Sequence, residues 1–300
     1  MTVIQCQDLI KTYGRKKILN KLSFSIKENS ITGLIGRNGA GKTTLLKIIS
    51  GYIKETSGHM SVFSEKPFNS LTVSINSIFV DDKMGFPPAL QLREILDVAG
   101  SFYPHWDEVL AKKLFDYFSF DPTDYHSRLS KGKTSTFNMI IGIASRCPLT
   151  IFDEPTTGMD EAVRKDFYRV LLKDYMAHPR TIILSSHHID EIEDILEDVL
   201  LLENGKTYFH LPVSELKEWG IGMKGHKKSV ERLLKNREIL YRKSIGNHST
   251  YVVFQNDLTQ EERQDAYLSG VELLPIRSSD LFIYLTNQGK GGIDDVFIND

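Results

Sequence analysis

The 300-residue sequence has the composition of an ordinary globular protein, with 41% hydrophobic and 25% charged residues, which excludes a disordered chain. Its 37 basic and 39 acidic residues give a net charge of −2, so no overall basic field points to nucleic acid, and we expect none as a partner. The two cysteines, Cys6 and Cys147, cannot build a disulfide framework and have no metal-ligand spacing, which fits a reducing cytoplasm.

The N-terminal residues contain no basic segment followed by an apolar stretch, and no window reaches the roughly 18 apolar residues of a spanning helix. We therefore expect a chain that is neither secreted nor embedded in a membrane. Two segments of alternating hydrophobicity, 3–10 and 18–26, flank a turn at 13–17 and predict a small antiparallel layer. Tyr13 at this turn is a candidate for stacking on an adenine, although a lone aromatic residue more often only packs.

The stretch 36–44 fits the phosphate-binding pattern G-x-x-x-x-G-K-[ST]. It follows the apolar run 31–35 and leads into apolar residues at helical spacing, so backbone N–H groups and the positive end of a helix dipole face one place. Lys42 is expected to reach the β and γ phosphates of ATP, and the Thr43 hydroxyl to ligate Mg²⁺. A chance glycine-rich turn is the alternative. The predicted nucleotide-binding residues of this loop are Gly36, Asn38, Gly39, Gly41, Lys42, Thr43 and Thr44.

Further strands are predicted at 58–63 and 77–80, and the pattern from 86 to about 128 is helical. We expect this helical region to be an insert between two strand-rich halves. It carries aromatic residues that fit either a local core or an exposed docking surface, and Phe102, Tyr103 and Trp106 near Pro104 are the candidates for the exposed surface.

Two strand ends after the insert carry residues suited to phosphate chemistry. The buried strand 149–153 ends in Asp153 and Glu154, and a strand has period-2 geometry, so one carboxylate can serve Mg²⁺ while its neighbour addresses the attacking water. The strand 181–186 ends at His187, which can donate to a γ-phosphate oxygen; we prefer it to His188 because it leaves the strand first. A helix is predicted between these strands at 161–176, and another at 189–196.

The character of the chain changes at about residue 213. Three glycines and the basic run 224–228 suggest a linker over 220–228. Helices are then predicted at 230–234, 259–268 and 279–286, with a hairpin over 238–254 and a strand at 271–274. This part shows no catalytic constellation, and we expect a small α+β appendage.

Over roughly residues 1–212, these motifs resemble the ATP-binding subunit of ABC (ATP-binding cassette) transporters. Besides Tyr13, the phosphate loop, the Asp153–Glu154 strand end and His187, the resemblance includes the signature loop 129–133 and Asp160. It implies an α/β P-loop NTPase fold with a mixed sheet core, an antiparallel β layer and a helical subdomain over about 84–145, followed by an accessory α+β domain over 213–300.

The resemblance also implies a head-to-tail dimer, of two identical or two different chains. ATP on the phosphate loop of one subunit is covered by the signature loop of the other, with Ser130 and Gly132 making the covering contacts and Asp160 contributing to the nucleotide site. Glu154 polarises the water, Lys42 and His187 assist catalysis, and Asp153 and Thr43 hold Mg²⁺. Closure of the dimer drives an integral membrane permease, which places the chain at the cytoplasmic face of the cell membrane.

Two departures from the family pattern occur. Lys131 and Lys133 replace a glycine and the glutamine of the usual Leu-Ser-Gly-Gly-Gln signature, and Asp81 or Asp82 stands where a glutamine is expected after the strand 77–80. Asp81 is therefore a candidate third residue at the metal. The lysine-bearing signature is similar to that of single-cassette exporters of peptides and antimicrobials in Gram-positive bacteria.

Two other functions fit parts of the sequence. One is a soluble ATPase of the same superfamily that acts on DNA or ribosomes, although its long coiled-coil insertions or second cassette are missing here. The other is a regulatory nucleotide-binding protein, which the two departures favour and the presence of Lys42, Asp153, Glu154 and His187 opposes. For the transporter function we expect the permease to dock at Phe86, Phe102, Tyr103 and Trp106.

Overall fold

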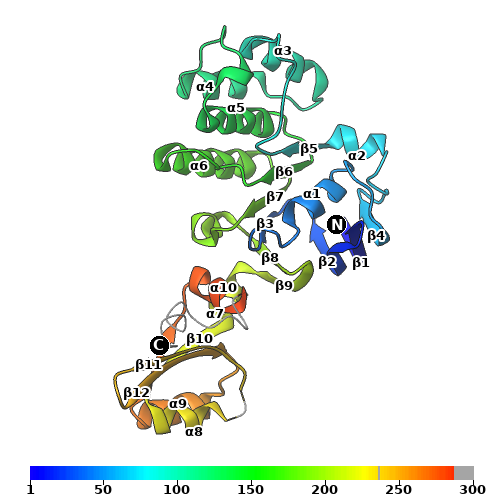
Figure 1. The fold of residues 1–300 in the computed structure, drawn as a ribbon. Helices are drawn as coiled ribbons and strands as arrows, with labels where there is room; N and C mark the ends of the chain where they lie inside the picture. Colours follow the sequence, from blue (N-terminus) through cyan, green and yellow to red (C-terminus); the bar gives the residue numbers. More distant parts are fainter. Residues whose placement is uncertain (236, 287–300) are drawn as a thin grey trace. The chain divides into compact units, whose positions relative to one another are not determined.

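In the computed structural model, residues 1–235 and 237–286 are described. The chain divides into two compact units, Met1–His210 and Leu211–Asp300. The centre of the first unit is a six-stranded sheet in the order β5-β6-β7-β3-β8-β9 (Figure 1). Its strands are β3 (Ile31–Ile35), β5 (Ser77–Val80), β6 (Leu149–Asp153), β7 (Thr181–Ser186), β8 (Asp198–Glu203) and β9 (Lys206–Pro212).

Five of these strands, β5, β6, β7, β3 and β8, are parallel to their neighbours. Their apolar side chains are buried nearly without interruption, as is typical of strands that are covered on both faces. Parallel pairing brings the carboxyl ends of all five strands to one edge of the sheet. The phosphate loop, Asp153 and His187 are therefore placed at the same edge.

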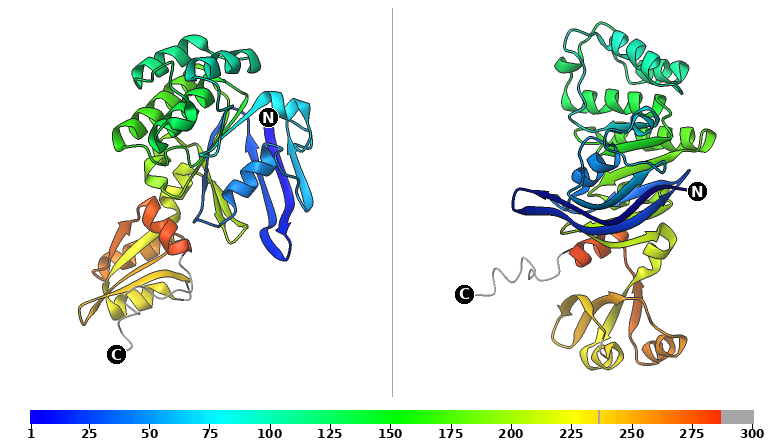
Figure 2. Two further views of the ribbon diagram at one scale, coloured as in Figure 1. Left: turned by 45° about the horizontal axis from the view of Figure 1, so that its top comes forward. Right: turned by 90° about the vertical axis from the view of Figure 1, so that its right-hand side faces the viewer.

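A second, antiparallel sheet in the order β2-β1-β4 consists of β1 (Thr2–Tyr13), β2 (Lys16–Lys27) and β4 (Ser57–Val62). Helix α1 (Lys42–Ile49) packs between the two sheets and contacts β2, β4 and β6 (Figures 1 and 2). Its buried residues Leu45, Leu46, Ile48 and Ile49 share one core with residues of both sheets. Helix α1 is thereby fixed with its N-terminus at the carboxyl edge of the large sheet.

The helical part of the first unit contains α3 (Leu92–Phe102), α4 (Glu108–Tyr117) and α5 (Lys131–Ala144), and α2 (Leu71–Asn76) precedes β5. Helix α5 lies beside α6 (Glu161–Ala177) and contacts β5 and β6. A partly buried charge network also connects α4 with α6, because Arg146 pairs with the α4 N-cap residue Asp107 at 2.8 Å and with Asp174 of α6 at 2.9 Å. Arg180 pairs with the same Asp174 at 2.8 Å.

The mixed sheet, the antiparallel layer and the helical part agree with the fold expected from the sequence. The predicted helix at 189–196 is wrong in detail. Two separate single turns of 3₁₀ helix, Ile189–Glu191 and Glu193–Ile195, occupy this segment, because Ile192 between them has a non-helical φ of −124°.

The second unit has the order β10, α8, β11, β12, α9, β13, which is a split β-α-β fold. Its antiparallel sheet has the strand order β11-β12-β10-β13, with two helices enclosing a small core of its own. The elements are α7 (Val213–Trp219), β10 (Gly220–His226), α8 (Lys227–Leu234), β11 (Ile239–Ile245), β12 (Ser249–Gln255), α9 (Gln260–Leu268), β13 (Glu272–Pro275) and α10 (Ser278–Thr286).

The linker predicted over 220–228 is wrong, since this segment forms the interior strand β10 and the start of α8. Its glycines are required by close packing. A Cβ on Gly222 would lie 2.6 Å from the Tyr251 hydroxyl, and one on Gly220 would lie 2.9 Å from Leu281 Cδ1. A glycine inside a strand can mark such a close approach rather than flexibility.

Candidate functional site

The phosphate loop connects β3 to α1. Gly39 and Gly41 have φ values of +86° and +106°, in the region that side-chain-bearing residues rarely adopt. A Cβ on Gly41 would also lie 2.6 Å from Leu19 Cδ2 of the antiparallel layer, so packing and backbone conformation both demand glycine there. Asn38 and Thr43 are exposed and Thr44 is half-buried at the first turn of α1, so the loop presents polar groups to solvent.

Lys42, the first residue of α1, is only 6% exposed. Its Nζ donates a hydrogen bond to the Gly36 carbonyl oxygen at 2.7 Å, across the loop. The same ammonium lies 3.1 Å from Glu154 Oε1. The ammonium and the carboxylate form an ion pair, but the angles at this contact are not those of a hydrogen bond. Oε1 is therefore a buried acceptor with no hydrogen-bond donor among the described residues.

Glu154 lies between two basic side chains from different elements. Its Oε1 faces Lys42, and its Oε2 lies 2.7 Å from His187 Nδ1. Glu154 follows the last residue of β6, and His187 follows the last residue of β7. Because β6, β7 and β3 are adjacent, three residues distant in sequence meet in one cluster. The His188 ring contacts the His187 ring in a tilted arrangement, with ring centroids 4.0 Å apart and an interplanar angle of 47°.

Asp153 faces a different partner from Glu154. Its carboxylate is 6% exposed, and Oδ1 accepts a hydrogen bond from Ser185 Oγ at 2.5 Å. The Ser185 oxygen in turn accepts the Glu154 N–H at 2.9 Å. Sequence reasoning missed Ser185, because the contact depends on the register that pairs it with Asp153 across two strands.

Mg²⁺ fits the oxygen groups of this edge. Mg²⁺ in nucleotide sites is held by one or two protein groups and by substrate phosphates. Thr43 has an exposed hydroxyl, and Asp153 has a second carboxylate oxygen that the Ser185 hydrogen bond does not use, so both residues can supply oxygen ligands. Within the described ranges, no cluster of three or more His, Cys, Asp or Glu side chains could hold a metal ion by itself.

Asp81 follows β5, and its Oδ1 accepts the backbone N–H of Lys83 at 3.0 Å. Burial raises the pKa of Asp81, the Lys83 N–H and Lys47 lower it, and nearby charges including Asp153 raise it again. The charge of Asp153 therefore acts on Asp81, while the Asp81 carboxylate is hydrogen-bonded within its own loop. Its role at the metal stays a prediction.

Tyr13 is the last residue of β1, and 51% of its surface is exposed. The Lys11 ammonium lies 5.0 Å from the centre of its ring. An exposed ring beside a lysine offers a flat surface and a positive charge to a nucleotide. Its contact with an adenine stays a prediction.

The signature loop leads into α5. Ser130 is the N-cap, and its Oγ accepts the Lys133 N–H at 3.3 Å. A hollow of about 460 Å³ in front of it is lined by Phe118 after α4, by the first residues of α5 and by residues between 158 and 163 around the start of α6. Asp160 lines the hollow and caps α6 by accepting the Val163 N–H at 2.9 Å. No residue of the phosphate loop lines this hollow.

Two details of the signature loop explain its unusual sequence. A Cβ on Gly132 would lie 2.5 Å from the Gly158 carbonyl oxygen, so this glycine is required by packing. Lys133, at the position of the family's glutamine, donates to the Phe118 and Ser119 carbonyl oxygens at 3.0 and 2.9 Å and lies over the Phe120 ring. Lys133 thus ties α5 to the end of α4, while Lys131 is exposed at the hollow.

The fold and the loop geometry define a P-loop nucleotide-binding cassette. The family model for ABC transporters matches residues 19–157. The bacitracin transport ATP-binding protein BcrA of Bacillus licheniformis is 31% identical over 231 residues, 72% of each chain. The ABC transporter ATP-binding protein YtrB of Bacillus subtilis is 27% identical over 216 residues, 72% of this chain and 74% of YtrB.

Solved structures show the same fold. An ATP-binding subunit of an ABC transporter superposes with a TM-score of 0.65 at 22% identity, covering 72% of this chain and 92% of that one. The dimeric cassette MJ0796 bound to ADP and phosphate gives a TM-score of 0.62 at 19% identity, covering 70% and 98%. The chain therefore belongs to the family of ABC transporter ATP-binding proteins, and it is an ATPase of that family. In the part of the chain that the structure describes, no helix is long and apolar enough to cross a membrane.

The contact between His187 and Glu154 generates a prediction with a neighbouring control. His187→Ala removes a donor from the cluster, and loss of one preorganised donor typically lowers turnover roughly 10²- to 10³-fold. His188→Ala removes the neighbouring ring that packs on His187, while the hydrogen bond to Glu154 is made by His187, so it should keep turnover within a few-fold. Steady-state ATPase assays compare the two. Equal losses in both variants would contradict the assignment of His187.

Proposed function

We propose that this ATPase uses the Lys42–Glu154–His187 cluster to hydrolyse Mg²⁺-bound ATP and to power a separate membrane permease, with residues 1–212 as the ATP-binding domain and 213–300 as an accessory domain. The observation that carries the proposal is the convergence of these three side chains on one point at the edge of the sheet. Lys42 and His187 would donate to the γ-phosphate. When bound, Mg²⁺ neutralises phosphate charge, and Thr43 and Asp153 would hold it.

Glu154 fits the role of general base. Its Oε1 has no hydrogen-bond donor among the described residues, and its Oε2 is held by His187. We propose that Oε1 accepts a hydrogen bond from the attacking water once Lys42 binds the γ-phosphate. A base must lie within hydrogen-bond reach of the proton that it takes. Lys42 and His187, the two partners of Glu154, are also the groups that could donate to an anionic γ-phosphate.

Glu154→Gln keeps the size and polarity of the side chain but removes the base. ATP binding should persist, while turnover should fall by roughly the 10²- to 10⁴-fold that is typical when a general base is lost. Nucleotide titration and phosphate release on the purified full-length chain measure the two effects. Wild-type turnover in Glu154→Gln would overturn this assignment.

We infer a composite site formed by two chains. The hollow before α5 carries a helix N-terminus and the exposed Lys131, which suit an anion, but it contains no residue of the phosphate loop. A second cassette, identical or different, can bring its ATP to this hollow. The dimeric structure of the similar cassette MJ0796 supports this arrangement.

Ser130→Arg places bulk and a long side chain at the mouth of the hollow. In the Glu154→Gln background, ATP should favour dimers, and adding Ser130→Arg should leave the protein monomeric at saturating ATP. Ser269→Arg, a matched change on the second unit, should not affect dimers. Light scattering with and without a sister cassette provides the measurement. ATP-dependent dimers in the Ser130→Arg protein would contradict the composite site.

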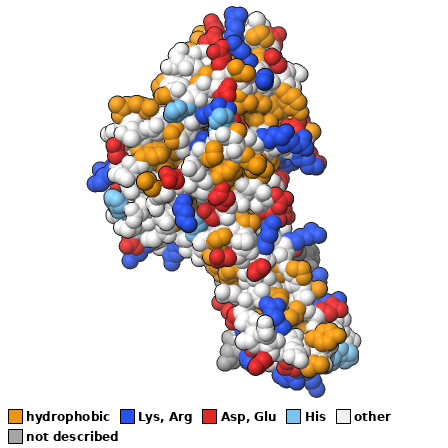
Figure 3. Space-filling view, turned by 180° about the vertical axis from the view of Figure 1, so that it is seen from behind, with side chains coloured by type: hydrophobic (Ala, Val, Ile, Leu, Met, Phe, Trp, Pro, Cys, Tyr) orange, Lys and Arg blue, Asp and Glu red, His pale blue; other side chains and the backbone are white. Residues whose placement is uncertain are grey.

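We propose that the permease docks in a groove of about 690 Å³ beside Asp81, at the position of the family's glutamine. Tyr52 and Phe102 line the groove and are 63% and 66% exposed. Val98, in the same helix α3 as Phe102, is also exposed, and Figure 3 shows clusters of hydrophobic side chains on the face of this unit that it draws. Apolar surface left in water costs about 25 cal/mol per Å², so such a groove favours a bound partner.

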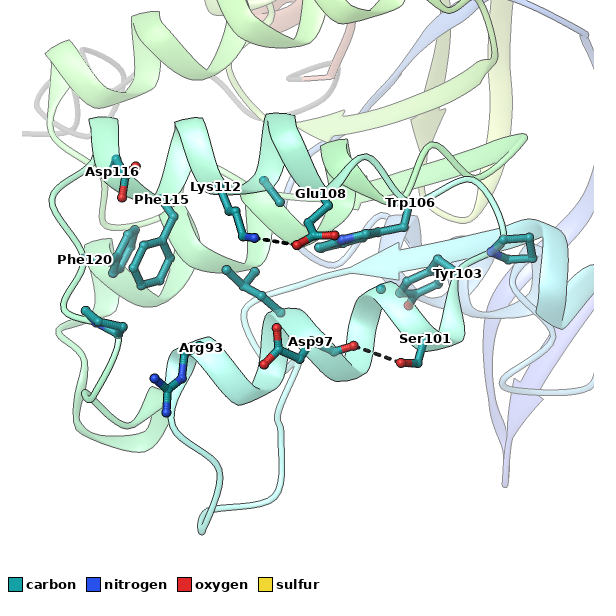
Figure 4. Close-up of a pocket in the computed structure, with 15 residues that line it drawn as sticks. Arg93, Asp97, Ser101, Tyr103, Trp106, Glu108, Lys112, Phe115, Asp116 and Phe120 are labelled. Carbon is teal, nitrogen blue, oxygen red and sulfur yellow. Dashed lines mark hydrogen bonds and ion pairs between the residues drawn. The ribbon is translucent and has the colours of Figure 1, made fainter.

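Two of the expected docking residues face elsewhere. Phe86 is half-buried and packs edge-on against His126 and Phe137, with ring centroids 4.9 and 6.1 Å apart. Trp106 lines a separate hollow of about 710 Å³ between α3 and α4 (Figure 4), where a Cβ on Gly100 would lie 3.1 Å from its ring. Tyr103 borders both hollows, and burial raises the pKa of its hydroxyl.

Tyr52→Ala with Phe102→Ala should release the chain from membranes that contain its permease. Loss of two aromatic anchors should weaken binding at least roughly tenfold, with ATP binding intact. The control pair Val109→Ala with Tyr267→Ala removes exposed side chains outside the groove and should leave membrane binding unchanged. Co-purification with the permease measures the effect. Equal retention of both double variants would overturn the docking site.

The cargo that we propose is a peptide or antimicrobial compound moved out of the cell. The relative BcrA is named for bacitracin transport, and it is 31% identical to this chain. The proposal places the chain at the cytoplasmic face of the membrane, held there by the permease.

A further inference from the structure

Ser185 is the penultimate residue of β7, and only 1% of its surface is exposed. Its hydroxyl donates to Asp153 Oδ1 at 2.5 Å and accepts the Glu154 N–H at 2.9 Å. A serine hydroxyl has one proton, so its donor is fully used by Asp153 while its oxygen is used by Glu154. One buried side chain therefore contacts both acidic residues of the β6 end.

The backbone of Glu154 needs this support. Its φ is +50°, a left-handed conformation that a residue with a side chain adopts rarely and keeps only where its surroundings enforce it. Its carbonyl oxygen accepts from the Thr157 hydroxyl at 2.9 Å and from the Thr157 N–H at 3.2 Å. The Ser185 hydroxyl oxygen accepts the N–H of the same residue, Glu154. The peptide groups before and after Glu154 are therefore both held by hydrogen bonds.

The turn decides where the two carboxylates point. Asp153 remains in the sheet and faces Ser185, whereas the left-handed turn directs Glu154 to Lys42 and His187. Without the hydroxyl, the partly buried Glu154 N–H and the buried Asp153 carboxylate oxygen would each lose a partner. The turn would then be free to relax toward ordinary backbone angles, which moves the Glu154 carboxylate.

We propose that Ser185 is a positioning residue for ATP hydrolysis, because its hydroxyl simultaneously holds the Asp153 carboxylate for the metal and fixes the turn that aims Glu154. This inference rests on the roles proposed above for Asp153 and Glu154. Partners that orient such groups typically change metal affinity or activity by 10- to 100-fold when they are removed.

A second buried hydroxyl in the same sheet provides the control. Thr32 lies in β3, which is adjacent to β7, and is fully buried. Its Oγ1 has no hydrogen-bond partner within the described residues. Thr32→Val removes a buried hydroxyl at nearly constant volume, so it reports what the mere loss of such a group does to the sheet.

The experiment compares Ser185→Ala, Ser185→Thr and Thr32→Val in the full-length chain. Ser185→Ala should lower kcat by roughly 10- to 100-fold and leave the KM for ATP within a few-fold. Ser185→Thr keeps the hydroxyl and should restore most of the rate, and Thr32→Val should match wild type. A readout independent of activity is hydrogen exchange of the Glu154 amide, which should lose protection in Ser185→Ala and keep it in the other two variants.

The outcomes separate this inference from the proposed function. If wild type hydrolyses ATP and Ser185→Ala has the same kcat and the same Glu154 amide protection, the positioning role is wrong while the ATPase assignment stands. Equal kcat in Ser185→Ala and Ser185→Thr would also overturn it. If wild type itself does not turn over ATP, the roles given to Asp153 and Glu154 fail first. Should Ser185→Ala not fold, Ser185→Cys, which keeps the volume but donates weakly, takes its place with the same expectations.

Discussion

The functional edge of this molecule depends on one set of contacts. The Glu154 carboxylate is held between the Lys42 ammonium and the His187 imidazole. This arrangement requires three parallel strands in fixed register, because each partner follows a different strand. It also requires α1 to start at Lys42, which the core between the two sheets enforces. A shift of one residue in any of these strands would reverse the facing of its side chains and separate the cluster.

The signature loop is also fixed by specific contacts, but it lies elsewhere in the unit. Gly132 packs on the Gly158 carbonyl, Ser130 caps α5, and Lys133 is bound to the end of α4. One unit therefore presents both the edge that we propose to be catalytic and a separate hollow that suits an anion. A pair of such units in head-to-tail arrangement would complete two sites, and the family to which the chain belongs makes this pairing the simplest account of both surfaces.

Most of the site could be predicted from the sequence because its motifs are local. The glycine pattern before Lys42 and the polar residues directly after apolar runs, at Asp153, Glu154 and His187, mark strand ends without knowledge of the fold. Ser185 could not be predicted in the same way, because its role exists only through the β6–β7 register. In the sequence, nothing distinguishes Ser185 from the other residues of the predicted strand.

The errors have the same physical origin. The glycines at 220 and 222 indicate a linker by composition. In the structure they lie in a buried strand and allow the side chains of Leu281 and Tyr251 to pack closely against it. Phe86 and Trp106 stand near prolines and were expected at the surface, yet tertiary packing on His126 and Gly100 draws them inward. The local sequence pattern indicates the type of element and the chemistry of its side chains. Non-local packing decides which of these side chains remain exposed to a partner or ligand.

The most direct measurement is a structure of the Glu154→Gln protein with Mg²⁺ and ATP. We expect a γ-phosphate oxygen within about 3.2 Å of Lys42 Nζ and a second one within hydrogen-bond distance of His187. Mg²⁺ should lie beside Thr43 and Asp153. A triphosphate bound away from Lys42, or a metal that contacts neither Thr43 nor Asp153, would contradict it.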